Sequence, residues 1–228
     1  MGAGSNARAG KPPKRRKWIN KPAAERIEVL GHRAFVGGTN AETWYGIGKR
    51  QYHWLISRGL RHDHRFLDIA CGSLRLGQFL IPYLDTGCYF GLEPEPSLVE
   101  KGLQDELLFD LGTTKAPRFG HGYGFDFSFV DGYDFAIAQS LLTHLNVEDI
   151  TRLMTNLRGV SEPGSRFYFT FFEGDGTRNP KGPSHANKSW HYRFAQLQEI
   201  AADTGWSLEY IGDWKHKRGQ KMVLATPS

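Results

Sequence analysis

Short apolar runs alternate with segments of helical periodicity along this 228-residue chain, and this alternation limits its fold more than any other feature. Strands that alternate with helices form crossover units, in which helices cover both faces of a mostly parallel sheet. We therefore predict an α/β fold whose ligands bind beyond the carboxyl ends of the strands. The clearest strand-like runs are RFLDIA at 65–70, CYFGLE at 88–93, YDFAIAQS at 133–140 and RFYFTFFE at 166–173.

The last part of the chain predicts how the sheet ends. A helix is expected at 193–203 and strands at 207–212 and 221–226. A short turn at Arg218-Gly219 joins these strands, so the final strand should be antiparallel. A further strand, interrupted by glycines, is expected at 118–123.

Four further helices are expected around the strands. The aromatic-rich segment at 41–60 has apolar residues at helical spacing, and helical periodicity resumes in LRLGQFLIPYL at 74–84. A third helix is expected in SLVEKGLQDELL at 97–108, and a fourth follows Asn146, which is a suitable N-cap residue.

Positive charge is concentrated at the start of the chain. Residues 1–22 contain seven Lys or Arg and no acid, so the formal net charge of +5 leaves −2 for residues 23–228. This Gly/Pro-rich basic segment has little to bury, which predicts a disordered tail before a single domain over 23–228. The nearly neutral domain does not favour nucleic acid as its partner, although such an arm could bind nucleic acid or an anionic surface.

Cysteine content and hydropathy limit the cellular context. Cys71 and Cys88 are too few for a zinc site or a disulfide framework, which fits a reducing cytoplasm. The sequence has no run of about 18 apolar residues and no apolar stretch in its first twenty residues, so we predict neither a membrane span nor a secretory signal.

The stretch DIACGSLRLG at 68–77 is the first candidate site. Asp68 ends the first strand, and Gly72 opens the next turn, where a missing side chain lets a ligand approach the backbone. Glu93 ends the second strand, where a carboxylate can accept hydrogen bonds from both ribose hydroxyls. Neither the three closely spaced glycines of a dinucleotide site nor a GxxxxGK[ST] loop occurs. These residues therefore predict a nucleoside ligand without phosphates.

Together these segments resemble the class I S-adenosylmethionine-dependent methyltransferases over residues 44–225. The matching pieces are LDIACGSLRLG, YFGLE, GYDFAIAQSLLTHL and SEPGSRFYFTFFE. The resemblance implies a Rossmann-like, seven-stranded, mostly parallel sheet with an antiparallel last strand, and S-adenosylmethionine (SAM) as the cofactor. Within the family, the pattern is most similar to bacterial O-methyltransferases that act on sugars in the assembly of methylated polysaccharides.

The resemblance also implies which residues contact the cofactor. Gly72 and its neighbours would face the methionine part, Glu93 the ribose, and Asp126 or Phe127 the adenine. Glu93 could instead be a charge at a helix N-terminus, and Asp126 a simple turn residue. Ala70 departs from the family, which more often has glycine there. The full implied set is Asp68, Ala70, Gly72, Arg75, Glu93, Asp126, Phe127 and Gln139, the last lying at the end of the fourth strand.

Methyl transfer from a sulfonium requires in-line placement of the acceptor and removal of its proton. His144 lies just past the fourth strand, and histidine titrates near neutrality, so we expect it to be the general base. Capping of the next helix or lining of the pocket is the alternative role for this histidine.

Glu173 and Asp175 flank Gly174 after the fifth strand and could hold Mg²⁺ against two acceptor oxygens, as in Mg²⁺-dependent O-methyltransferases. The alternative is that both carboxylates are simply solvated. The 174–189 loop has the length of a lid or acceptor loop. Three residues on or beside it have open roles: His185, Trp190 and His191.

The sequence thus predicts an enzyme that methylates a hydroxyl oxygen of a carbohydrate acceptor of the mannoside type, or else of another small metabolite. One rival is an RNA methyltransferase that uses the basic arm, although the (N/D)PP(Y/F) signature of amino-group methylation is absent. A cofactor-binding sensor or partner subunit is a second rival, and an NAD-dependent reductase is a third. The acceptor, the methylated position and the formation of a homo-oligomer stay open.

Overall fold

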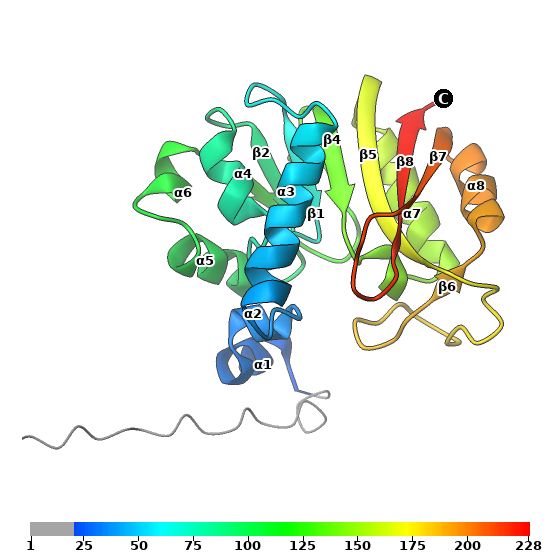
Figure 1. Cartoon of the computed structure of the whole chain (residues 1–228), viewed down its shortest axis with the longest axis horizontal. Helices are drawn as coiled ribbons and strands as arrows, with labels where there is room; N and C mark the ends of the chain where they lie inside the picture. Colours follow the sequence, from blue (N-terminus) through cyan, green and yellow to red (C-terminus); the bar gives the residue numbers. More distant parts are fainter. Residues whose placement is uncertain (1–20) are drawn as a thin grey trace, which may run out of the picture.

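The computed structural model describes residues 21–228, so the predicted tail at 1–22 lies almost entirely outside the described residues. Within them, an eight-stranded sheet has the order β3-β2-β1-β4-β5-β8-β7, and β6 pairs with β5 (Figure 1). The strands are β1 (Phe66–Ile69), β2 (Tyr89–Leu92), β3 (Arg118–Gly120), β4 (Tyr133–Ala138), β5 (Ser161–Glu173), β6 (His191–Tyr192), β7 (Trp206–Asp213) and β8 (Lys221–Pro227).

The pairing of the strands confirms the predicted fold class. Strands β1 to β5 are paired in parallel, whereas β8 is antiparallel to both of its neighbours, β5 and β7. The seven strands of the main path match the expected number. The two-residue strand β6 was not predicted, because two residues form no recognisable apolar pattern.

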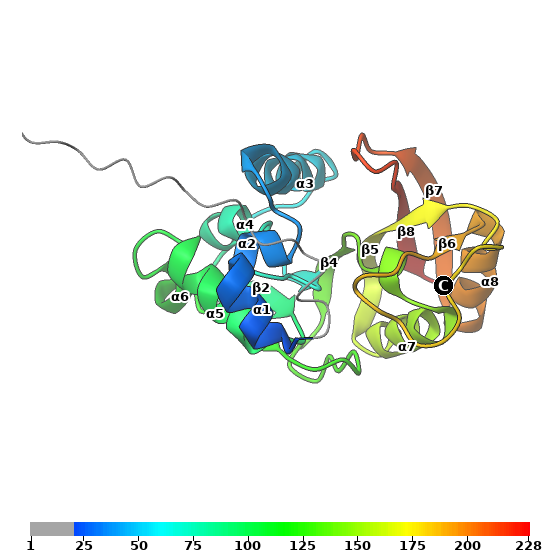
Figure 2. The same ribbon diagram turned by 90° about the horizontal axis from the view of Figure 1, so that it is seen from below.

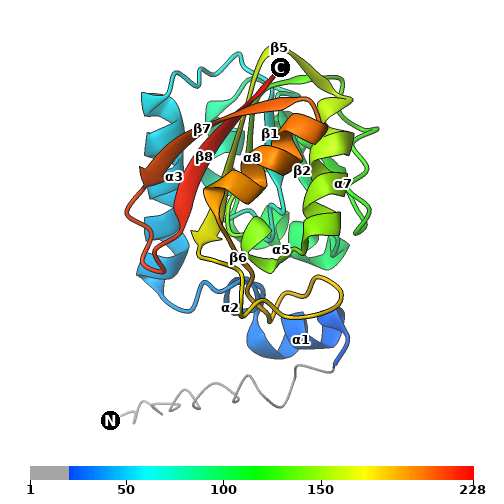
Figure 3. The same ribbon diagram turned by 90° about the vertical axis from the view of Figure 1, so that its right-hand side faces the viewer.

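Helices lie on both faces of the sheet, and α3 and α7 stand on opposite sides of the strands in Figure 3. Successive side chains of a strand point to opposite faces, so Phe66 packs toward α3 and α4 while Leu67 packs toward α7. The helical segments are α1 (Ala23–Leu30), α2 (His32–Phe35), the π-helical η2 (Glu42–Gly46), α3 (Ile47–Ser57), α4 (Gly77–Tyr83), α5 (Pro96–Asp105), α6 (Leu111–Thr114), the 3-10 helix η3 (Leu142–His144), α7 (Val147–Arg158) and α8 (Phe194–Asp203).

Two parts of the helix prediction need correction. The helix after β1 starts at Gly77 rather than Leu74, because Leu74 has a φ of 63°, which an α-helix cannot contain. Helices α1 and α2 were not predicted, since α1 has a single buried residue, Ile27, and α2 has none. The predicted N-cap of α7 is confirmed, because Asn146 accepts a hydrogen bond from the amide of Asp149 at 2.9 Å.

The carboxyl ends of the parallel strands meet at one edge of the sheet. In Figure 1 this lower edge also carries α1, α2, the long connection from β5 to β6, and the turn between β7 and β8. Any ligand at this edge is therefore surrounded by segments from both ends of the chain. Cys71 and Cys88 are free thiols, and none of the helices among residues 21–228 has the length and hydropathy of a membrane span.

Candidate cofactor and acceptor site

A hydrogen bond joins the two predicted nucleoside loops at this edge. The amide of Gly72 donates to Glu93 Oε2 at 3.0 Å, and the amide of Glu95 donates to Glu93 Oε1 at 3.2 Å. Gly72 has a φ of 57°, a left-handed conformation that glycine adopts at little cost. An ionised carboxylate offers about four lone-pair positions, so these two bonds leave acceptor capacity for ribose hydroxyls.

Burial raises the proton affinity of the two acids at this edge. Glu93 is 7% exposed and Asp68 is 5% exposed. Loss of hydration raises the pKa of each carboxyl to about 7, although the Tyr89 hydroxyl donates to Asp68 Oδ2 at 2.9 Å. The predicted ribose acid is thus a carboxyl that changes charge near neutral pH.

The rest of the glycine loop supplies unused polar groups. Among residues 21–228, the buried Ser73 hydroxyl and Arg75 Nε have no hydrogen-bond partner. Burial lowers the pKa of the Arg75 guanidinium to about 10, so the group stays charged at neutral pH. A hydroxyl and a charged donor fit the polar methionine end of SAM, whose carboxylate is an acceptor. Ala70 has a φ of 61°, a left-handed conformation that glycine adopts at lower cost than alanine.

Residues 31–38, which we call the cover segment, lie directly over the glycine loop. Val36 Cγ1 is 3.2 Å from the place that a Cβ on Gly72 would take, and Arg75 Nη2 donates to the Val36 carbonyl. Arg33 binds the carboxylate of Glu106 through two hydrogen bonds of 2.5 and 2.8 Å. The Glu106 side chain is only 1% exposed, so this contact fixes the cover segment to the end of α5. Sequence reasoning missed this cover.

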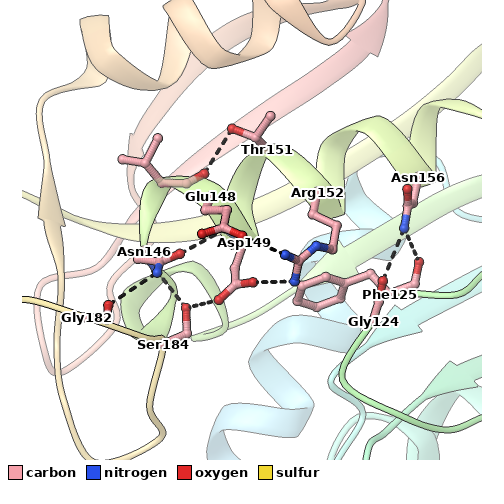
Figure 4. A network of polar contacts seen from close by, with 11 residues as sticks. Gly124, Phe125, Asn146, Glu148, Asp149, Thr151, Arg152, Asn156, Gly182 and Ser184 are labelled. Carbon is pink, nitrogen blue, oxygen red and sulfur yellow. Dashed lines mark hydrogen bonds and ion pairs between the residues drawn. The ribbon is translucent and has the colours of Figure 1, made fainter.

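The two residues predicted to contact adenine lie in the loop after β3, one of them buried and the other exposed. Phe127 is 3% exposed and packs in the core beneath α7, while the exposed Asp126 accepts a hydrogen bond from the Ser128 amide at 2.8 Å. This hydrogen bond fits the alternative interpretation of Asp126, in which it is a simple turn residue. Figure 4 shows how Asn156 of α7 holds this loop by donating to the carbonyls of Gly124 and Phe125, at 3.1 and 3.0 Å.

Two other residues of the same loop lie closer to Glu93. His121 Nδ1 donates to the Glu93 carbonyl at 2.8 Å, and the Tyr123 hydroxyl donates to Glu95 Oε1 at 2.7 Å. Tyr123 is 72% exposed, so its ring is available to a planar base. The tyrosine in HGYGFDF could have indicated this base-facing position from the sequence, but the sequence prediction did not use it.

Gln139 belongs to a polar network that joins β4, β5 and β8. Its Nε2 donates to Gln220 Oε1 at 3.2 Å, and Thr170 Oγ1 donates to the same oxygen at 2.9 Å. Gln220 Nε2 donates in turn to Ser140 Oγ at 2.6 Å. This network attaches the turn between β7 and β8 to the site edge, and it directs Gln139 toward that turn.

The β5 to β6 connection fixes His144 in place. His144 Nδ1 lies 2.6 Å from the carbonyl oxygen of Lys188, and Trp190 donates its amide to the Thr143 carbonyl at 2.9 Å. A carbonyl can only accept, so the ring must carry its proton on Nδ1, which makes Nε2 the basic nitrogen of the neutral imidazole. Figure 4 shows the neighbouring contacts, in which Asn146 donates its amide to Ser184 Oγ at 2.8 Å.

The predicted magnesium ligands do not form a metal site. The Glu173 carboxylate accepts from the Tyr210 hydroxyl at 2.8 Å, on the side of β7. Asp175 instead accepts from the amide and hydroxyl of Thr177, and these hydrogen bonds lower its pKa. In the described part of the chain, no group of three or more His, Cys, Asp or Glu side chains could hold a metal ion. The two carboxylates therefore do not fit the expected Mg²⁺, and no step is assigned to a metal.

Solved structures share this fold. No protein-family model matches the sequence. The magnesium protoporphyrin IX methyltransferase ChlM from Synechocystis PCC 6803 with bound SAM is 18% identical, with a TM-score of 0.62 over 93% of this chain and 95% of that one. The glycopeptide N-methyltransferase MtfA is 13% identical, with a TM-score of 0.60 over 79% and 90%. The DhpI complex with S-adenosylhomocysteine (SAH) is 17% identical, with a TM-score of 0.62 over 86% and 93%. At these identities the likeness establishes the fold, which is the class I fold of SAM-dependent methyltransferases.

Proposed function

We propose that this protein transfers the methyl group of SAM to a hydroxyl oxygen of a carbohydrate-type acceptor, with His144 as the general base. The observation that carries the proposal is the hydrogen bond from Gly72 to Glu93, because it brings the two nucleoside loops together at the carboxyl edge of the sheet. Two of the similar structures hold SAM or SAH, which supports the same cofactor for this chain. The carbohydrate acceptor is inferred from the sequence resemblance.

In this proposal, one group of residues binds the cofactor and another residue accepts the proton of the acceptor. Bound SAM supplies an electrophilic methyl group, so the protein must place the acceptor oxygen in line and accept its proton. Glu93 and Arg75 would hold the ribose and the methionine end. The Lys188 carbonyl fixes the tautomer and the orientation of His144, so that Nε2 is the nitrogen that takes the acceptor proton.

The experiment measures labelled methyl transfer from SAM to mannosides, glucosides, phenols and bulk RNA by the wild type and by His144→Asn. Asparagine keeps an N–H near the position of Nδ1 and can still donate to the Lys188 carbonyl, but it cannot accept the proton. We expect turnover to fall by about 10²- to 10⁴-fold, the usual contribution of a positioned base. Binding of SAH, followed by calorimetry, should change less than about twofold.

His53→Asn, on the exposed side of α3, serves as the matched control and should keep wild-type turnover. Turnover of His144→Asn close to that of the wild type would remove the base assignment. Label on RNA alone would contradict the carbohydrate acceptor and favour the basic arm as the binding element. Omission of Mg²⁺ and addition of EDTA should leave the rate unchanged.

A further inference from the structure

We propose that a basic cluster between α3 and the β7–β8 turn binds an anionic group of the acceptor, either a carboxylate or a phosphate. The cluster consists of Arg50, Trp214, His216 and Arg218, and we call it the hairpin cluster. The inference deepens the proposed function, on which it rests for the presence of an acceptor at this edge. The acceptor would then be an acidic or phosphorylated molecule rather than a neutral one.

Two contacts hold the β7–β8 turn against the helix. Arg50 Nη1 donates to the carbonyl of Lys215 at 2.6 Å, and Lys217 Nζ lies 2.6 Å from a carboxylate oxygen of Glu42. The turn is also attached to the carboxyl end of β4 through the buried Gln220. The hairpin cluster therefore has a fixed position beside the reacting edge, which Figure 2 shows from below with α3 and the turn on the same side of the sheet.

Positively charged groups surround one neutral side chain of the cluster. His216 is 8% exposed, and burial together with the charges of Arg218, Arg50 and Arg75 lowers its pKa to about 4. The imidazole is thus neutral at pH 7 while three guanidinium groups act on it. Like charges that gather in this way repel one another unless an anion lies between them.

The acids near the cluster do not balance this charge. Glu42 pairs with Lys217, and Asp213 accepts a hydrogen bond from the Lys215 amide at 2.8 Å. Among residues 21–228, Arg50 and Arg218 take part in no ion pair with a carboxylate. The sulfonium of SAM would add a further positive charge at the same edge, so an anionic acceptor group would compensate both.

The cluster also holds a buried donor without a partner. Trp214 is 6% exposed, and its Nε1 has no hydrogen-bond partner among the residues that the structure describes. An indole N–H can only donate, and a buried donor left without an acceptor destabilises the protein. Its ring stacks on His216 with centroids 5.3 Å apart and an interplanar angle of 10°. An anionic oxygen in the cluster would be a suitable acceptor for this N–H.

The placement of Arg218 connects the cluster with the acceptor side. Its guanidinium carbon lies 4.9 Å from the ring centroid of Phe172 near the end of β5, and Phe172 stacks on His191 at 5.1 Å. A planar guanidinium can stack on an aromatic ring while its N–H groups bind a carboxylate or phosphate. His191 thus packs against the same aromatic ring on which Arg218 stacks.

The experiment titrates protein saturated with SAH with inorganic phosphate, glucuronate, glucose 6-phosphate and glucose. Binding is followed by the NMR signal of the Trp214 indole N–H, which is assigned with Trp214→Phe. We expect a saturable shift with the anions and none with glucose. In Arg50→Gln/Arg218→Gln the affinity for the anions should fall by at least about tenfold, because two charge-assisted contacts are lost. The matched control is Arg61→Gln/Lys101→Gln, which removes the same charge from exposed positions elsewhere.

A response to glucuronate alone would identify a carboxylate site, and a response to the phosphates alone a phosphate site. The inference is overturned if none of the three anions shifts the signal, or if the double variant binds them as tightly as the wild type and the control do. Because the measurement needs no turnover, it separates the two proposals. Methyl transfer to a neutral sugar without anion binding would contradict the hairpin cluster, whereas anion binding without methyl transfer to any acceptor would contradict the proposed function.

Discussion

The pH dependence of stability should depend on Glu93. Its ordinary pKa of 4.5 rises to about 7 in the folded protein, mainly because burial removes hydration from the carboxylate. Between these two values the folded state keeps a proton that the unfolded state has lost, so the free energy of unfolding falls as the pH rises. Above pH 7 both states are ionised, and this contribution becomes constant.

The size of the effect follows from the two pKa values. Between pH 5 and pH 8, ionisation of Glu93 should lower the free energy of unfolding by about 2.5 kcal/mol. Glu93→Gln keeps the size of the side chain and removes the ionisation. Some stability is lost at every pH, since Gly72 and Glu95 donate to different oxygens of the carboxylate and a carboxamide replaces one of these oxygens with an NH₂ donor. The variant should therefore gain about 2.5 kcal/mol relative to the wild type between pH 5 and pH 8.

Urea denaturation of the cofactor-free protein at pH 5, 6, 7 and 8 measures this difference. Asp68 is present in both proteins, so its own ionisation largely cancels in the comparison. Glu199→Gln, at an exposed position of α8, is the control and should follow the wild type at every pH. A difference between Glu93→Gln and the wild type that stays constant from pH 5 to pH 8 would refute the raised pKa of Glu93.

Two further predictions concern the segments that frame the site. Asn146→Ala removes the acceptor for the Asp149 amide and should lower the free energy of unfolding by about 1 kcal/mol, measured in urea; no change would contradict the capping role. Glu106→Gln leaves the Arg33 guanidinium without one of its two acceptor oxygens, which should lower the free energy of unfolding by about 1–3 kcal/mol. The same variant should bind SAH more weakly, as measured by calorimetry, because the cover segment is then less firmly held. An affinity equal to that of the wild type would contradict this function of the cover segment.

The features predicted correctly are those with a local physical signature. Continuous apolar runs identified β1 and β4, which are almost entirely buried. Asn146 was recognised because an N-cap needs a short polar side chain directly before a helix. The hydrogen bond from Gly72 to Glu93 places both residues at one edge of the sheet, while their contact with one ligand stays a prediction.

The features that were missed depend on contacts between distant parts of the chain. The cover segment is fixed by Arg33 and Glu106, which are 73 residues apart and give no periodic signal. The magnesium prediction was based on the closeness of Glu173 and Asp175 in sequence, yet their carboxylates bind different partners. The hairpin cluster joins α3 to the β7–β8 turn, 165 residues later.

Binding of SAM by the loops at Gly72 and Glu93 underlies every role proposed above, and it is tested by calorimetric titration with SAH at pH 7.5. We expect saturable binding of one SAH per chain to the wild type and to Glu199→Gln. Binding to Glu93→Gln should be at least about tenfold weaker, because the ionised acceptor for the ribose hydroxyls is lost. No binding to the wild type, or equal binding to all three proteins, would contradict a SAM site at these loops.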